Sequence, residues 1–98
     1  DNIAIGHDTL KHITDATANT AVGKGALGLS TASNNTGVGY HALNQNTTGT
    51  RNTTVGANSL DANTTGSYNT SLGYASLGAN TIGGENVAVG DAALLSNT

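Results

Sequence analysis

Residues 52–68 read NTTVGANSLDANTTGSY, and close copies of this segment make up almost the whole 98-residue chain. Each copy starts at an asparagine, and successive starts lie 17, 16, 17, 17 and 17 residues apart. The six copies start at Asn2, Asn19, Asn35, Asn52, Asn69 and Asn86. Self-similarity at a fixed period is typical of repeat architectures, in which each copy forms one unit that packs on the next. The sequence therefore predicts a single repeat domain over residues 1–98.

Several positions are invariant when each copy, which we call a rung, is numbered from its first asparagine. The fourth position is always aliphatic, the fifth is always glycine, the ninth is always leucine and the thirteenth is always threonine. The leucines are Leu10, Leu27, Leu43, Leu60, Leu77 and Leu94, and the threonines are Thr14, Thr31, Thr47, Thr64, Thr81 and Thr98. Positions this regular are expected to have the same environment in every rung.

The second and fourth positions are apolar or β-branched, and a small residue stands between them, as in Thr20-Ala21-Val22. Alternation with a period of two predicts a short strand, with the second and fourth positions on its buried face. The fifth-position glycine ends this strand at a corner. A second short strand is expected at the eighth and ninth positions, before a polar Asn-Thr-Thr-Gly corner. Glycine recurs too often for a stable helix.

Two short strands and two corners in 17 residues form one turn of a parallel β-solenoid (a β-roll or β-helix). We therefore predict an all-β fold of six 17-residue rungs, stacked about 4.8 Å apart. Stacking places the first-position asparagines, from Asn2 to Asn86, above one another, and we expect an amide ladder between their side chains. The thirteenth-position threonines are expected to form a second ladder, in which methyl and hydroxyl groups pack in a row.

Each rung offers little apolar material for a core. Val, Ile and Leu together number 18 of the 98 residues, and the chain lacks Phe, Trp, Met, Cys and Pro. Ordering the backbone costs about 1–2 kcal/mol per residue, which one leucine and one other fixed aliphatic residue per rung offset poorly. We therefore predict an intertwined homotrimer, in which the small residues of the third and eighth positions let the chains approach closely. We also expect these residues to be a segment of a longer fibre, or to associate end to end.

The charge of the chain argues against some partners. It has three Lys or Arg residues and six Asp or Glu residues, with a formal net charge of −3. Three basic residues are too few for the positive surface that binds a phosphate backbone, so we expect no nucleic-acid partner. No apolar run approaches the ~20 residues that cross a bilayer, so we expect no membrane insertion in this segment.

The motifs with chemical meaning are weak. Gly23-Lys-Gly-Ala-Leu-Gly28 matches a dinucleotide-binding fingerprint, but that motif needs a helix after it, and Gly23 is simply the corner glycine of its rung. His7, His12 and His41 share no repeat position, so they do not predict a metal site. No serine or threonine has a base and an orienting acid at a recognisable spacing. We therefore predict that the chain is not an enzyme and has no cofactor.

The sixth position varies from rung to rung and directly follows the corner glycine. A solvated corner is the simplest interpretation, because variable loop positions are usual on any surface. The alternative is an edge that contacts a cell-surface glycan or a protein receptor, since tyrosine combines an apolar ring with a polar group. The candidate residues for this edge are His7, Lys24, Tyr40, Tyr74 and Asp91.

Two segments, Asn35-Thr-Gly-Val-Gly-Tyr-His-Ala-Leu and Asn52-Thr-Thr-Val-Gly-Ala-Asn-Ser-Leu, resemble repeats of bacteriophage tail-fibre and related surface proteins. Such repeats often precede a self-cleaving chaperone of the endosialidase type. Asn2-Ile-Ala-Ile-Gly and Asn86-Val-Ala-Val-Gly are similar to the head repeat of trimeric autotransporter adhesins, although the period here is longer. That second resemblance implies a left-handed parallel β-roll built as an intertwined homotrimer.

The resemblance implies a structural or adhesive segment of an extracellular trimeric fibre, on a cell surface or a virion, which acts as a spacer or displays a receptor-binding surface. A second hypothesis is an ice-binding β-solenoid that uses the thirteenth-position threonine ladder. Ice binding needs a flat face with two threonine rows. The second position supplies a partial row, which Ile3 and Val87 interrupt, made of Thr20, Thr36, Thr53 and Thr70.

Overall fold

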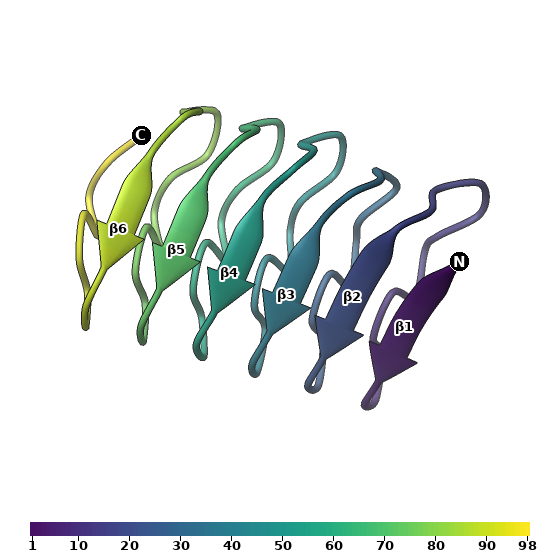
Figure 1. The fold of residues 1–98 in the computed structure, drawn as a ribbon. Coiled ribbons are helices and arrows are strands. Elements are labelled where there is room, and N and C mark those ends of the chain that lie inside the picture. The colour runs from purple at the N-terminus through teal and green to yellow at the C-terminus, as the bar shows by residue number, and fades with distance from the viewer.

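The computed structural model describes all 98 residues, and it contains six short strands and no helix. The strands form one sheet in the order β1-β2-β3-β4-β5-β6, as Figure 1 shows. Their bounds are β1 (Asn2–Ile5), β2 (Asn19–Val22), β3 (Thr36–Val38), β4 (Thr53–Val55), β5 (Thr70–Leu72) and β6 (Val87–Val89). Neighbouring strands are parallel, so the chain makes one full turn between each strand and the next. The result is a rod of about 31 × 21 × 15 Å.

The strands pair in the register that the repeat predicts. Thr36 lies opposite Thr53 and Val38 lies opposite Val55, and the other strand pairs likewise join equal repeat positions. The 16-residue second copy does not shift the register, because Thr20 still lies opposite Thr36. The prediction of an all-β parallel β-solenoid with turns of about 17 residues is confirmed.

The second strand expected at the eighth and ninth positions does not form. Every ninth-position leucine has a left-handed backbone, with φ between 49° and 54°, and Ala75 at a seventh position has φ 52°. Left-handed residues cannot continue a strand. This wall is still hydrogen-bonded from rung to rung, because the N–H of Leu43 donates to the carbonyl of Ser59 at 3.0 Å.

Stacked leucines form the centre of the core. Leu27, Leu43, Leu60 and Leu77 are completely buried in one apolar cluster. The other buried members of that cluster are Ala21, Ala26 and Ala88. The core is therefore a narrow file of leucines, one per rung, with alanine methyl groups beside it.

The strand side chains point in the opposite direction from the one predicted. The third-position residues face the core, as Ala21 and Thr54 show by their complete burial, whereas Ile5 and Val89 are 61% and 66% exposed. The interior is narrow at this position, since a Cβ added to Gly37 would lie 3.1 Å from the carbonyl oxygen of Ala42 and 3.4 Å from Cγ of Leu27. The prediction that the second and fourth positions form the buried face is wrong.

The same narrowness overturns the predicted role of the small residues. The eighth-position residues Ala26, Ala42, Ser59 and Ser76 are completely buried inside their own chain. The third-position residues of β2 to β6 are buried as well. These residues therefore do not provide a surface on which another chain could approach.

The first-position asparagines bind mainly the backbone rather than one another. The Oδ1 atom of Asn35 accepts a hydrogen bond from the N–H of Asn52 at 3.0 Å, and its Nδ2 donates to the carbonyl of Gly49 at 2.9 Å. Direct bonds between first-position amides occur only towards the C-terminal end, from Asn69 to Asn52 at 3.1 Å and from Asn86 to Asn69 at 3.0 Å. Over most of its length, the predicted amide ladder is thus replaced by hydrogen bonds from the asparagine side chains to the backbone of neighbouring rungs.

A continuous amide ladder exists at the twelfth position, which the sequence analysis placed only in a polar corner. Nδ2 of Asn63 donates to Oδ1 of Asn46 at 2.8 Å, and Asn80 donates in the same way to Asn63 at 3.1 Å. Asn97 continues the ladder to Asn80 at 3.1 Å. Asn46, Asn63 and Asn80 are completely buried, so the core has a polar half in which amides satisfy one another.

The thirteenth-position threonines form the expected row along one corner. Their hydroxyls donate to the backbone of the next rung, from Thr47 to the carbonyl of Thr64 at 3.0 Å and from Thr64 to the carbonyl of Thr81 at 3.1 Å. These hydroxyls are therefore engaged within the solenoid and tie its corner together.

Candidate functional site

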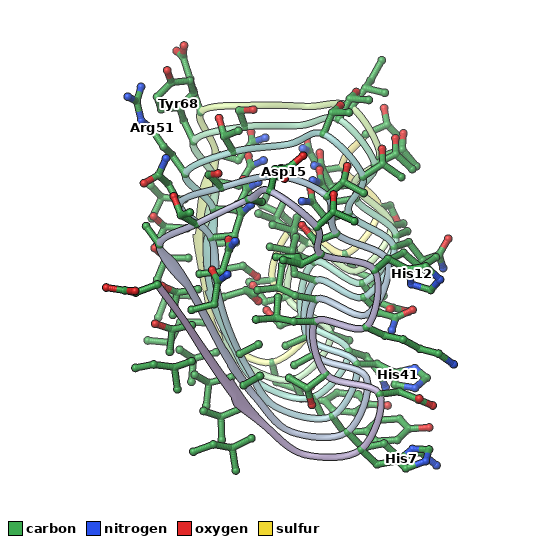
Figure 2. The ribbon with its side chains drawn as sticks, turned by 90° about the vertical axis from the view of Figure 1, so that its right-hand side faces the viewer. His7, His12, Asp15, His41, Arg51 and Tyr68 are labelled. Atoms are coloured by element: carbon green, nitrogen blue, oxygen red, sulfur yellow. The ribbon has the colours of Figure 1, made fainter.

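The outer surface of the six-stranded sheet runs along the whole stack. We call it the sheet face, and it consists of the second- and fourth-position side chains of all six strands. Its residues are Ile3, Ile5, Thr20, Val22, Thr36, Val38, Thr53, Val55, Thr70, Leu72, Val87 and Val89. None of them carries a charge. In Figure 2, His7, His12 and His41 lie on the side of the solenoid away from the strands.

The sheet face presents two parallel rows. The in-register pairing stacks Val38 on Val55 and Thr36 on Thr53, so a mainly aliphatic row runs beside a mainly threonine row. Side chains in a row are separated by the spacing of the strands, about 4.8 Å. Residues at the two ends are the most open, with Ile5 and Val89 both well exposed. A contiguous uncharged surface of this kind is typical of an interaction site.

The five sixth-position residues predicted as a receptor edge lie at the corner that follows each strand. All five are exposed, and they are His7, Lys24, Tyr40, Tyr74 and Asp91. The ring of Tyr40 stacks on the neighbouring His41, with 4.1 Å between the ring centroids and 5° between the planes. The corner is therefore accessible and partly ordered by stacking, and its role in receptor binding stays a prediction.

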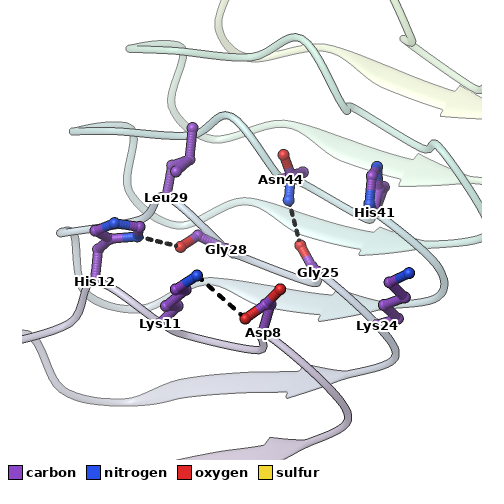
Figure 3. Close-up of a pocket in the computed structure, with 9 residues that line it drawn as sticks. All are labelled: Asp8, Lys11, His12, Lys24, Gly25, Gly28, Leu29, His41 and Asn44. Atoms are coloured by element: carbon purple, nitrogen blue, oxygen red, sulfur yellow. Dashed lines mark hydrogen bonds and ion pairs between the residues drawn. The ribbon is translucent and has the colours of Figure 1, made fainter.

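The wall opposite the sheet face carries a depression of about 250 Å³ over the first three rungs, shown in Figure 3. Two glycines, Gly25 and Gly28, form its floor, and charged and polar side chains surround them. The complete lining is Asp8, Lys11, His12, Lys24, Gly25, Gly28, Leu29, His41 and Asn44. This depression was not predicted from the sequence, although two of its lining residues, Gly25 and Gly28, belong to the Gly23–Gly28 motif.

Asp61 is the one acid whose ionisation the structure clearly perturbs. Burial raises the pKa of the Asp61 carboxyl above its ordinary value of 3.8, and the positive charge of His41 opposes that shift. Its Oδ1 atom is buried and has no hydrogen-bond partner. At the same repeat position one rung earlier, Nδ2 of Asn44 donates to the carbonyl of Gly25 at 2.6 Å. An amide thus suits this position better than a carboxylate does.

We expect Asp61→Asn to stabilise the fold at pH 7 by about 1 kcal/mol, because it removes an unsatisfied acceptor and a poorly solvated charge. The folded carboxyl of Asp61 has a raised pKa. As the pH rises from 3.8 towards that folded value, the unfolded state loses its proton first, so the wild type loses stability over this window. The advantage of Asp61→Asn should therefore shrink as the pH falls below this window.

Urea unfolding at a series of pH values measures this difference. Asp15→Asn is the matched control, because it makes the same change of formal charge at an exposed acid. Parallel pH profiles for the wild type and Asp61→Asn would contradict the assignment.

The structure places the histidines and the fingerprint motif outside the arrangements that a metal site or a dinucleotide-binding motif requires. No group of three or more His, Cys, Asp or Glu side chains is arranged to hold a metal ion. Gly23 ends β2 and is followed by a turn, and no helix follows Gly28. The structure also contains no helix with the length and apolar character that crossing a membrane requires.

The function of this chain has to be inferred from its own residues. No protein-family model matches it, and no curated protein or solved structure is significantly similar to it.

Proposed function

We propose that this chain is a structural segment of an extracellular homotrimeric fibre, of the tail-fibre or surface-adhesin kind, in which three copies associate through their sheet faces. In this proposal the solenoid acts as a rigid spacer, and the sixth-position corner remains available to a receptor. The observation that carries it is the uncharged sheet face, which extends over all six strands.

The distribution of apolar residues supports association through this face. Folding of one chain buries a file of leucines but leaves the aliphatic side chains of the sheet face exposed or half-buried. Burying apolar area is worth about 25 cal/mol per Å², so a partner that covers this surface adds the stabilisation that a thin core lacks. Interface centres are depleted in charged residues, and the sheet face has none. A second copy of the chain offers the matching apolar surface.

The placement of the polar side chains supports the display role. The charged and aromatic residues of the sixth position follow the corner glycine, and His7 and His41 lie on the side away from the sheet face in Figure 2. Association through the sheet face would therefore leave Tyr40, Tyr74 and Lys24 in solvent. The residues that stack the rungs are the same in every rung, whereas the exposed sixth position varies. The rod can therefore present a different side chain at each rung.

Sedimentation analysis of the 98-residue chain tests the proposal, and we expect a species with three times the 9.6 kDa protomer mass. Val55→Lys combined with Leu72→Lys places two charges at the centre of the proposed interface and should give monomers with an unchanged β-type circular dichroism spectrum. Tyr40→Lys combined with Tyr74→Lys is the matched control, since it also replaces two exposed large residues with lysine but lies outside the sheet face. A monomeric wild type, or equal dissociation of the control, would overturn the proposal.

Ice binding remains the second candidate function. The structure favours the sheet face, rather than the thirteenth-position threonines, as the surface that would bind ice. The hydroxyls of the thirteenth-position threonines donate to backbone carbonyls at a corner, whereas Thr36 and Thr53 stand side by side on the flat sheet face. An ice-binding role would thus use the rows of the sheet face, and a trimer that buries this face would exclude it. Thermal hysteresis in a dilute solution of monomer would favour this candidate over the fibre.

A further inference from the structure

The depression on the wall opposite the sheet face has a composition that is unusual for this chain. Only three Lys or Arg residues occur in the sequence, and two of them, Lys11 and Lys24, line the depression. His12 and His41 are also part of its lining, and Asp8 is its only acid. Two of the three cationic side chains are therefore gathered at one place on a molecule whose formal net charge is −3.

The second rung, which forms the middle of the depression, has glycine at both its seventh and its tenth position. No other rung has this pair, since the seventh position elsewhere is Asp8, His41, Asn58, Ala75 or Ala92. A Cβ on Gly25 would lie 2.6 Å from Cδ2 of His41, and a Cβ on Gly28 would lie 2.7 Å from Nδ2 of Asn44. His41 and Asn44 of the third rung thus pack directly against the two glycines, at positions that any larger residue in the second rung would disturb.

Hydrogen bonds fix the polar rim in place. Nδ2 of Asn44 donates to the carbonyl of Gly25 at 2.6 Å. The carbonyl of Gly28 can only accept, so Nδ1 of His12, at 2.8 Å, is the donor. These two bonds cover the carbonyl groups of the floor, which would otherwise repel an anion. The rim is therefore preorganised around a floor whose acceptors are already occupied.

The charges leave one cation free. Asp8 lies 3.3 Å from Nζ of Lys11, which balances its negative charge, and 3.2 Å from Nδ1 of His7. Lys24 forms no ion pair in the structure and lies on the rim of the depression. Asp61, the next acid along this wall, lies at the tenth position one rung beyond Asn44. The space above Gly25 and Gly28 is thus flanked by an unpaired ammonium group and by a second lysine.

We propose that this depression binds the oxyanion group, a carboxylate, sulfate or phosphate, of a small ligand, with Lys24 as its main charge partner. The hollow of about 250 Å³ is smaller than the ~300–1,000 Å³ of pockets for drug-sized molecules, so it fits one acidic group attached to a single ring. An acidic monosaccharide unit and a phosphorylated small molecule share this chemistry. The site does not depend on the proposed trimer, because it lies on the opposite wall from the sheet face.

Titration of the ¹⁵N-labelled chain, followed by amide chemical shifts at constant ionic strength and pH 7, tests the site. The probes are sodium phosphate, sodium sulfate, glucuronate, and glucose as the uncharged comparison. We expect saturable shifts centred on Lys24, Gly25, Gly28 and Asn44 with at least one of the three anions and none with glucose. Binding of glucuronate would indicate an acidic sugar, and binding of phosphate alone would indicate a phosphorylated ligand.

Charge variants separate a site from general screening. Lys24→Gln should weaken binding by about two- to fivefold, and Asp8→Asn should strengthen it by a similar factor. Arg51→Gln is the matched control, because it removes one positive charge at a corner where Arg51 contacts Tyr68, and it should leave the affinity unchanged. Gly28→Ala places a Cβ 2.7 Å from Nδ2 of Asn44, so it should displace that amide from the rim and weaken binding.

Non-saturable shifts with all three anions would overturn the proposal, and so would equal effects of Lys24→Gln and Arg51→Gln. Neither result would bear on the sedimentation test of the fibre, so the two proposals fail independently.

Discussion

Gly39→Ala is expected to abolish cooperative folding of the chain. Gly39 has φ +136°, a region that only glycine occupies readily, and a Cβ there would lie 2.6 Å from the carbonyl oxygen of Gly56 in the next rung. The two rungs cannot separate, because the N–H of Gly56 donates to the carbonyl of Val38 at 2.8 Å. Domains of this size are stable by about 5–15 kcal/mol, so a backbone clash added to a strained φ removes most of that margin.

Gly90→Ala separates the clash from the backbone strain. Gly90 has nearly the same backbone, with φ +127°, but the nearest atom to an added Cβ is Cβ of Ala93 at 3.9 Å. Only the conformational cost remains there, about 1–3 kcal/mol. Urea unfolding followed by circular dichroism should therefore show a weakened but cooperative transition for Gly90→Ala. Equal losses in the two variants would show that contact between rungs is not the cause.

Leu60→Ala is expected to lower the free energy of unfolding by about 3–5 kcal/mol. Leu60 is completely buried and lies in the file of leucines between Leu43 and Leu77. Its N–H donates to the carbonyl of Ser76 at 2.9 Å, and the N–H of Leu43 donates to the carbonyl of Ser59 at 3.0 Å. These hydrogen bonds fix the spacing between rungs. Neighbouring leucines therefore cannot move to fill the cavity that Leu60→Ala would leave.

Leu94→Ala is the matched control, because it changes the same repeat position with the same left-handed backbone. Leu94 lies in the last rung and is 50% exposed, so its truncation should cost less than about 1 kcal/mol. Urea unfolding measures both losses. Similar losses for Leu60→Ala and Leu94→Ala would contradict a core built on the leucine file.

The stacking of the rungs was predictable because it depends only on the period. The glycine at the fifth position of each rung and the leucine at its ninth position mark the same place in every turn. The parallel register follows from them. The direction of the strand side chains was not predictable in the same way. A strand with aliphatic residues on one face and Ala, Gly, Thr or Ser on the other is normally buried on its aliphatic face. Here the opposite wall comes so close that only the small face fits inside.

The left-handed leucines and the second amide ladder were missed for local reasons. Leucine rarely adopts positive φ, so nothing in the residue type signals that Leu43 or Leu60 has a left-handed backbone. The twelfth-position asparagines belong to an Asn-Thr-Thr-Gly segment with the composition of a solvent-exposed turn, and only the turn geometry shows that Asn63 points inward. The depression is formed by residues of three successive rungs. The sequence of one rung therefore shows only its two glycines, Gly25 and Gly28.

The register of the stack underlies the sheet face, the depression and the buried ladders, and it is tested most directly by distances between leucine methyl groups. Nuclear Overhauser effects in a leucine-methyl-labelled sample should connect Leu27 to Leu43, Leu43 to Leu60, and Leu60 to Leu77. Leucines two rungs apart should show no such connection. Loss of the connection between Leu43 and Leu60, or a contact between Leu43 and Leu77 in its place, would contradict the in-register solenoid.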